Sequence, residues 1–270
     1  MHDAAFPLSL PVTLSVLAGA LLYTASWVRC FRVEREQASW WRLASFLSGT
    51  LVLWIALGSP LSQMDHHALS AHMLQHLLVM NLAAPLLLLG APFAVVVAGQ
   101  PRGVAEALER GARSAVGRFF SHPLVTWLLA TAVVVGWHLP RVLELTLKAP
   151  GWHAVQHASF LLAGLLFWSP VVRPWPAIAV WPRWALPLYL FAATLPCDAL
   201  AAFLAFSGRV VYPHYLAVHA DSRHSTLSDQ ATAGALMWCA VTVAYLVPAV
   251  LITLELLSPR RAVRADEAAS

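Results

Sequence analysis

Charged side chains are scarce in this sequence. Asp, Glu, Lys and Arg make up 11% of its 270 residues, and 59% of the residues are hydrophobic. The mean hydropathy is +0.67. Soluble domains are about one quarter charged, so an ordinary soluble domain is excluded. We expect an all-α, polytopic membrane protein with the lipid bilayer as its main solvent. Without a repeat or a long polar insert, residues 1–270 are predicted to form a single membrane domain.

Cysteine pairs and common catalytic motifs are also missing. The three cysteines, Cys30, Cys197 and Cys239, form no CxxC pair, which argues against a disulfide framework or a thiolate metal site. HExxH, GxSxG and GxxxxGK[ST] do not occur. The net charge of +4 does not indicate nucleic-acid binding, because in a membrane protein the location of charge matters more than its sum. We therefore expect no enzymatic activity and no nucleic-acid partner.

Long apolar runs predict the membrane spans. A helix needs about 20 mainly apolar residues to cross a bilayer. The first run lacks the basic region and cleavage site of a signal peptide, so we expect it to be retained as a span. Seven runs qualify: Leu8–Val28, Trp41–Leu57, Ala71–Ala98, Pro123–Leu145, Ala154–Val172, Trp184–Phe206 and Ala231–Leu257.

The placement of Lys and Arg predicts the orientation. Most of the 17 basic residues lie in the loops after spans one, three and five and in the tail, residues 258–270. The positive-inside rule puts these segments in the cytoplasm, and hence the N-terminus outside and the C-terminus inside. The connector 99–122 resembles a short basic amphipathic helix at the inner leaflet, although a solvated connector explains it equally well.

Histidines gather on the opposite, outer side of the predicted membrane. Two spans each carry a His-x-x-x-His pair, and another histidine lies at a similar depth in span four. Residues four apart share a helix face, so each pair can point at one ion. Ionisable residues within a membrane are costly and are candidate functional residues. The predicted metal ligands are His72, His76, His138, His153 and His157.

Other polar or sulfur-containing side chains lie close to this layer. A ligating imidazole usually donates its second N–H to a carboxylate or carbonyl, a role open to Asp198 and Asp229. The alternative for Asp198 is a helix-packing hydrogen bond. Soft sulfur favours Cu(I), so methionine beside histidine favours copper as the metal. The predicted supporting residues are Gln75, Gln156, Asp198, Asp229, Gln230 and Met73.

Five further outer histidines lie in predicted loops. We interpret them as solvated surface residues, with transient metal docking as the alternative. They are His66, His67, His214, His219 and His224.

Four stretches of the sequence resemble the CtaG family of multi-pass cytochrome c oxidase assembly proteins, which is associated with caa-type oxidases. They are HMLQHLLVMNLAAPLLLLGAP, GWHLP, HAVQHASFLLAGLLFWSPV and SDQATAGALMW, and the similarity covers about residues 59–250. The resemblance implies a seven-span protein of the bacterial plasma (inner) membrane that helps to form an active haem–copper oxidase, usually by metallation of its copper centre. It implies oxidase subunits and extracytoplasmic copper chaperones as partners. It assigns no ligands, so the metal roles depend on helix geometry.

Three hypotheses remain open. The first is a copper-handling assembly factor without catalytic turnover. The second is a b-type haem protein that transfers electrons, with histidines on facing helices as axial ligands. The third is a metal-free scaffold for oxidase subunits. The single outer layer of histidines favours the first, because transmembrane electron transfer often uses inner and outer haem pairs.

Overall fold

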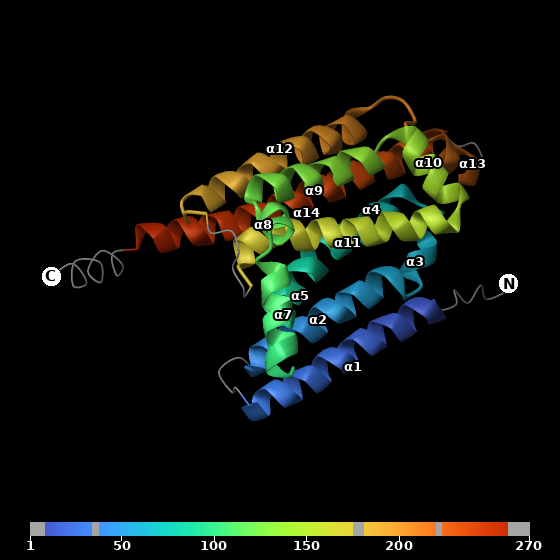
Figure 1. Ribbon diagram of the computed structural model, residues 1–270. Coiled ribbons are helices and arrows are strands. Elements are labelled where there is room, and N and C mark those ends of the chain that lie inside the picture. Colours follow the sequence, from blue (N-terminus) through green and yellow to red (C-terminus); the bar gives the residue numbers. More distant parts are fainter. Residues whose placement is uncertain (1–8, 34–37, 175–180, 220–222, 259–270) are drawn as a thin grey trace.

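The computed structural model of the protein describes residues 9–33, 38–174, 181–219 and 223–258 (Figure 1). Over these ranges the regular structure is helical, which confirms the all-α prediction. The elements are α1 (Leu10–Val33), α2 (Trp40–Leu57), α3 (Leu61–Met64), α4 (Leu69–Leu77), η1 (Leu78–Ala83), α5 (Ala84–Leu89), α6 (Pro92–Ala98), α7 (Arg102–Ala112), α8 (Ala115–Ser121), α9 (Pro123–Trp137), α10 (Pro140–Lys148), α11 (Pro150–Val172), α12 (Ala185–Phe206), α13 (Pro213–Val218) and α14 (Arg223–Leu257).

Six helical stretches of the described residues are long and apolar enough to cross a membrane. A seventh is added if α8 and α9, which meet at a 65° bend, count as one broken span. Large apolar side chains such as Leu14, Leu188 and Leu251 are exposed on these helices, as expected where lipid is the solvent. The chain is therefore a multi-pass membrane protein.

The fourth predicted span, Pro123–Leu145, was wrong at its C-terminal end. Helix α9 ends at Trp137, and α10 begins separately at Pro140. Proline disfavours helical backbone in the residue before it, and Leu139 has the expected extended ψ of 127°. The break leaves His138 at the C-cap position of α9 rather than inside a continuous span.

The third span contains a π-helical turn, η1. Such turns widen a helix, and they frequently occur at functional sites. The indole Nε1 of Trp168 on α11 donates a hydrogen bond of 3.1 Å to the carbonyl of Met80 within this turn. A Cβ on Gly164 would lie 2.9 Å from both this carbonyl oxygen and the Ala84 Cβ, so glycine allows α11 to approach closely.

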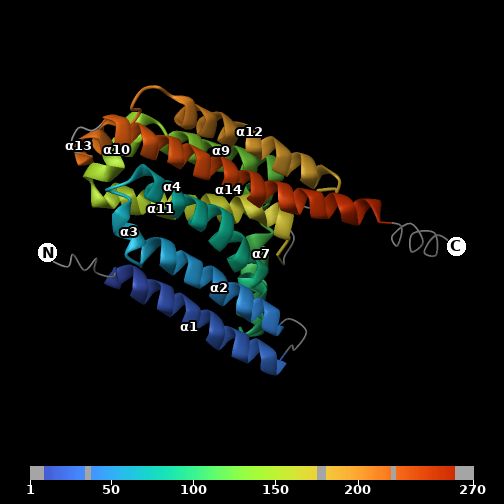
Figure 2. The same ribbon diagram turned by 180° about the vertical axis from the view of Figure 1, so that it is seen from behind.

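The apolar core lies between α9, α11, α12, α14 and the third span, around Phe160, Phe167, Leu190 and Val241. Helices α1 and α2 lie side by side along one flank of this bundle (Figures 1 and 2). The Tyr23 hydroxyl on α1 donates to the Gly90 carbonyl at 2.7 Å and so connects that flank to the third span. Helices α3, α10 and α13 gather at the end of the bundle where α1 begins (Figure 1).

The connector 99–122 forms two helices, α7 and α8, where the sequence predicted one. Ser114 separates them, and its hydroxyl accepts a hydrogen bond of 3.2 Å from the Gly117 backbone N–H at the start of α8. Helix α7 runs crosswise to α1 and α2 (Figures 1 and 2). Of the predicted tail 258–270, only residue 258 lies within the described residues.

Candidate metal centre

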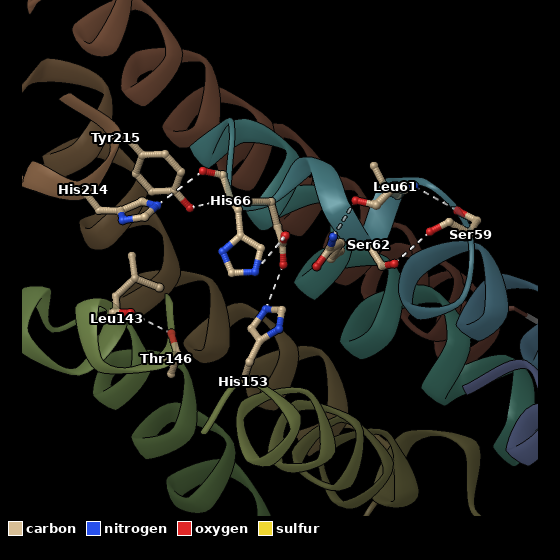
Figure 3. Close-up of polar contacts among 11 residues, drawn as sticks. Ser59, Leu61, Ser62, His66, Leu143, Thr146, His153, His214 and Tyr215 are labelled. Carbon is tan, nitrogen blue, oxygen red and sulfur yellow. Dashed lines mark hydrogen bonds and ion pairs between the residues drawn. The ribbon is translucent and has the colours of Figure 1, made fainter. Parts of the chain in front are cut away.

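Asp65 occupies the turn between α3 and α4, and its side chain is fully buried. Its Oδ2 lies 2.8 Å from Nε2 of His153, which reaches it from α11, and its Oδ1 lies 3.8 Å from Nε2 of His66. The Tyr215 hydroxyl donates to the Asp65 backbone carbonyl at 2.7 Å. Figure 3 shows His66, His153 and Tyr215 converging on this turn. The turn is thus fixed from both α11 and α13.

The pKa of Asp65 is lower than its ordinary value. Burial acts to raise it, but the contact with His153 and the nearby His72 and His66 imidazoles outweigh that effect. A carboxylate with a lowered pKa is ionised near neutral pH, so this end of the bundle contains a buried negative charge.

Asp65, His153 and His157 form a group with the spacing of metal ligands. One potential ligand atom from each lies within 4.8 Å of the other two. The two histidines are one turn apart on α11, with ring centroids separated by 4.3 Å. Carboxylate oxygen and imidazole nitrogen are common ligands of transition metals. The His-x-x-x-His spacing on this helix therefore brings both imidazoles to one place, with Asp65 as an additional potential ligand.

The second predicted pair faces the first across the interface of α4 and α11. The His72 and His76 rings are 4.2 Å apart, and they lie 6.1 Å from His153 and 5.6 Å from His157, respectively. Both side chains are buried, and none of their ring nitrogens has a hydrogen-bond partner among the described residues. Buried polar groups without partners are costly. Four of the five predicted ligands thus form one cluster with Asp65.

The fifth predicted ligand, His138, is held by different contacts. Its Nδ1 lies 2.6 Å from the Val134 carbonyl oxygen, and its Nε2 lies 3.4 Å from the Met73 sulfur. The Tyr212 hydroxyl donates to the His138 backbone carbonyl at 2.9 Å. His138 and Met73 were predicted as ligand and supporting residue of a single site, and the structure places them against each other.

The glutamines before His76 and His157 have different environments. Gln75 donates from Nε2 to the Leu61 carbonyl at 2.7 Å, which ties α4 to the segment preceding Asp65. Gln156 is fully buried, and neither its side-chain oxygen nor its nitrogen has a partner among the described residues.

The three remaining supporting residues lie on α12 and α14. Gln230 accepts from the Val211 N–H at 2.8 Å and donates to the carbonyls of Leu204 and Arg209, so it holds the loop after α12. Asp229 contacts the start of α4. Asp198 is half-buried on α12, and its Oδ1 has no partner among the described residues. These hydrogen bonds therefore support structural roles for Gln230 and Asp229.

The outer histidines are more varied than predicted. His67 is exposed, as expected, but the His66 ring lies 5.5 Å from that of His153. His214 Nε2 lies 3.3 Å from the His66 carbonyl oxygen, and His219 Nδ1 lies 2.8 Å from the Tyr215 carbonyl oxygen. The His224 side chain lies outside the described residues. His66 thus belongs to the edge of the cluster.

Sequence reasoning missed Asp65. The signal available was an acid directly before two histidines, in the segment MDHH. The prediction of ligands considered only residues at a common depth within the predicted spans, and Asp65 lies in a turn outside them. A hollow of about 380 Å³ opens beside His153 and His157, with Val12 of α1, Leu57 of α2 and Leu161 of α11 among its walls. Small solutes can therefore approach the cluster from the side of α11.

The fold and the cluster define a multi-pass helical membrane protein with a buried acid–histidine centre at one end of its bundle. The model of the cytochrome c oxidase caa3 assembly factor family matches residues 21–258. The chain belongs to this family.

Similar curated proteins come from mycobacteria. The chain is 24% identical over 235 residues to uncharacterised proteins of Mycobacterium bovis and Mycobacterium tuberculosis, a match that covers 82% of this chain and 35% of each relative. An uncharacterised protein of Mycobacterium leprae is 25% identical over 229 residues, or 81% of this chain and 34% of that protein. The chain thus spans about one third of the length of these relatives. No solved structure matches the chain.

Proposed function

We propose that this protein supports the metallation of a copper centre in a caa3-type cytochrome c oxidase by binding a copper ion at the cluster of Asp65, His72, His76, His153 and His157. One observation carries the proposal. Ligand atoms of Asp65, His153 and His157 converge within 4.8 Å beside two buried imidazoles that lack hydrogen-bond partners. Membership of the assembly-factor family supplies the biological context. Copper is the cargo in this proposal and is passed on to the oxidase.

The charge of the cluster suits a monovalent cation. Neutral imidazole is the form that binds metals, so Asp65 contributes the single negative charge of the group. A Cu(I) ion bound there makes a neutral complex, which reduces the cost of burying charge. A divalent ion leaves a net charge of one in the same buried place. Imidazole and carboxylate also bind zinc, so a zinc titration is the natural comparison.

We further propose that the cluster faces the outside of a bacterial plasma membrane. The part of the connector that carries α7 and its arginines, together with the C-terminal end of α14, then lies in the cytoplasm, in agreement with the positive-inside rule. Seven spans result if α8 and α9 cross as one broken span. Copper enters from outside through the hollow beside His153, delivered by an extracytoplasmic chaperone, and leaves to an oxidase subunit.

Metal binding and oxidase activity together test this proposal. Four detergent-purified proteins would each be titrated with Cu(I) and with Zn(II). They are the wild type, Asp65→Asn, His157→Ala and the exposed control His67→Ala. The same variants would be expressed with the oxidase in a host that lacks this protein. In Asp65→Asn and His157→Ala we expect roughly 10- to 100-fold weaker copper binding and reduced oxidase activity. The control His67→Ala should show no change in either.

Two results would overturn the proposal. Full oxidase activity in folded Asp65→Asn and His157→Ala protein would indicate a metal-free scaffold. A Soret band in the purified wild type that disappears in His157→Ala would show that the histidines bind haem instead.

A further inference from the structure

A second group of potential ligands surrounds a small cavity farther along the bundle from Asp65. The cavity has a volume of about 30 Å³ and lies between the third span, α9, α11, α12 and α14. Three of the five methionines of the chain line it. A thiol and two imidazoles also line it. The residues around the cavity with sulfur or ring nitrogen atoms are therefore Met73, Met80, Met237, Cys197, His76 and His138.

The contact between His138 and Met73 has the geometry of two ligands facing one ion. The Val134 carbonyl oxygen, 2.6 Å from Nδ1 of His138, can only accept a hydrogen bond, so Nδ1 carries the proton. The Nε2 atom is then an unprotonated lone-pair donor, and it lies 3.4 Å from the Met73 sulfur. Neither atom has a hydrogen to give the other. For bonds of about 2.0 Å to nitrogen and about 2.3 Å to sulfur, this separation corresponds to an angle of about 104° at the metal.

We infer that this cavity is a distinct binding site for Cu(I), held by the Met73 thioether and the His138 imidazole, with Met237 and Met80 as further sulfur ligands. Thioethers select soft Cu(I) over harder divalent ions. The volume accommodates a single ion but no organic cofactor. Methionine also fills irregular gaps in ordinary cores, but simple packing does not explain two lone pairs directed at each other beside a void.

His76 connects this inner site to the Asp65 cluster. Its ring lines the cavity and also lies 5.6 Å from the ring of His157. Neither of its ring nitrogens has a hydrogen-bond partner among the described residues, so either one, as the unprotonated nitrogen of a neutral imidazole, is available to a metal. The biological role of the inner site rests on the proposed function, because His76 gives copper held at Asp65 and His157 a path into the sulfur-lined cavity. Binding of Cu(I) at the inner site does not depend on it.

The test is Cu(I) binding by the full-length, detergent-purified chain under anaerobic conditions, measured by competition with a chelator and by X-ray absorption. The variants are Met73→Leu, Met237→Leu and His138→Gln, since leucine nearly preserves the volume of methionine. Met64→Leu is the control, because Met64 is exposed on α3. Asp65→Asn reports on the outer cluster alone. Size-exclusion profiles confirm that each variant is folded.

We expect sulfur neighbours at about 2.3 Å from copper in the wild type, in Met64→Leu and in Asp65→Asn. Met73→Leu and Met237→Leu should reduce the sulfur signal and weaken one class of Cu(I) sites on the order of tenfold or more. Only nitrogen or oxygen neighbours in the wild type, or an unchanged spectrum in Met73→Leu, would overturn the inference. Sulfur-bound copper together with full oxidase activity in Asp65→Asn would leave the inner site standing and refute the proposed function.

Discussion

The Asp229 carboxylate on α14 accepts a hydrogen bond of 2.6 Å from the backbone N–H of Leu69 at the start of α4. It also accepts from the backbone N–H and the hydroxyl of Ser70. Ala68, at the N-cap position, has no side chain that can accept hydrogen bonds from these backbone N–H groups. The carboxylate of Asp229, from another helix, caps them instead. A negative charge is also favourable at a helix N-terminus. Asp229 thus sets where the helix carrying His72 and His76 begins.

Replacing this cap should destabilise the protein. We expect Asp229→Ala to lower the free energy of unfolding by about 1–2 kcal/mol. Asp229→Asn keeps an acceptor and should recover part of the loss. Ser228→Ala, at the exposed neighbouring position, is the control and should have no comparable effect. Thermal unfolding in detergent measures all three. Equal stability of Asp229→Ala and the wild type would show that the hydrogen bonds to α4 contribute nothing.

Two buried tyrosines offer a matched pair of hydroxyl deletions. Tyr215 donates to the Asp65 carbonyl, and Tyr212 donates to the His138 carbonyl. We expect Tyr215→Phe to weaken metal binding at the Asp65 cluster and Tyr212→Phe to weaken Cu(I) binding in the methionine-lined cavity. Each should cost about 1–3 kcal/mol of stability, because a buried carbonyl loses its partner. Separate Zn(II) and Cu(I) titrations distinguish the two effects, and identical binding profiles for both variants would contradict the assignment.

Gly234 permits the close approach of α14 to α12. A Cβ at this position would lie 2.7 Å from both the Ala201 carbonyl oxygen and the Ala205 backbone nitrogen, and rigid backbone cannot move aside easily. We expect Gly234→Ala to cost about 1–3 kcal/mol through overpacking. Gly136→Ala on α9, where a Cβ meets open space, should instead stabilise the helix by about 0.5–1 kcal/mol. Melting temperatures that shift in the same direction would contradict this account.

The glutamines at positions 75 and 156 should respond differently to removal of their amides. Gln75→Leu leaves the Leu61 carbonyl without its partner and should lower stability by about 1–3 kcal/mol. Gln156→Leu removes an amide with no partner among the described residues, so the metal-free protein should be unchanged or more stable. Unfolding measured with a metal chelator present checks both. A clear loss of stability in Gln156→Leu would show that its amide is satisfied.

Much of the helical framework could be predicted from the sequence, because hydropathy and four-residue spacing are local properties. Each His-x-x-x-His pair lies on one helix face, as the spacing indicated, and the fold then brings the pairs on α4 and α11 opposite each other. Local patterns did not separate His138 from the other histidines, since equal depth does not determine which helices are neighbours. Asp65 was missed because a turn has no periodicity and α11 approaches it only in the folded chain.

The π-helical turn η1 has a consequence for the geometry of the whole third span. A wide turn contains one residue more than an α-helical turn of the same rise, and each residue of an α-helix accounts for about 100° of rotation. Removing a single residue between Leu78 and Ala83 would therefore rotate α4 by about that angle relative to α5. The His72 and His76 rings would then turn away from α11. The extra residue of η1 thus sets the rotation of α4 that directs both imidazoles towards His153 and His157 on α11.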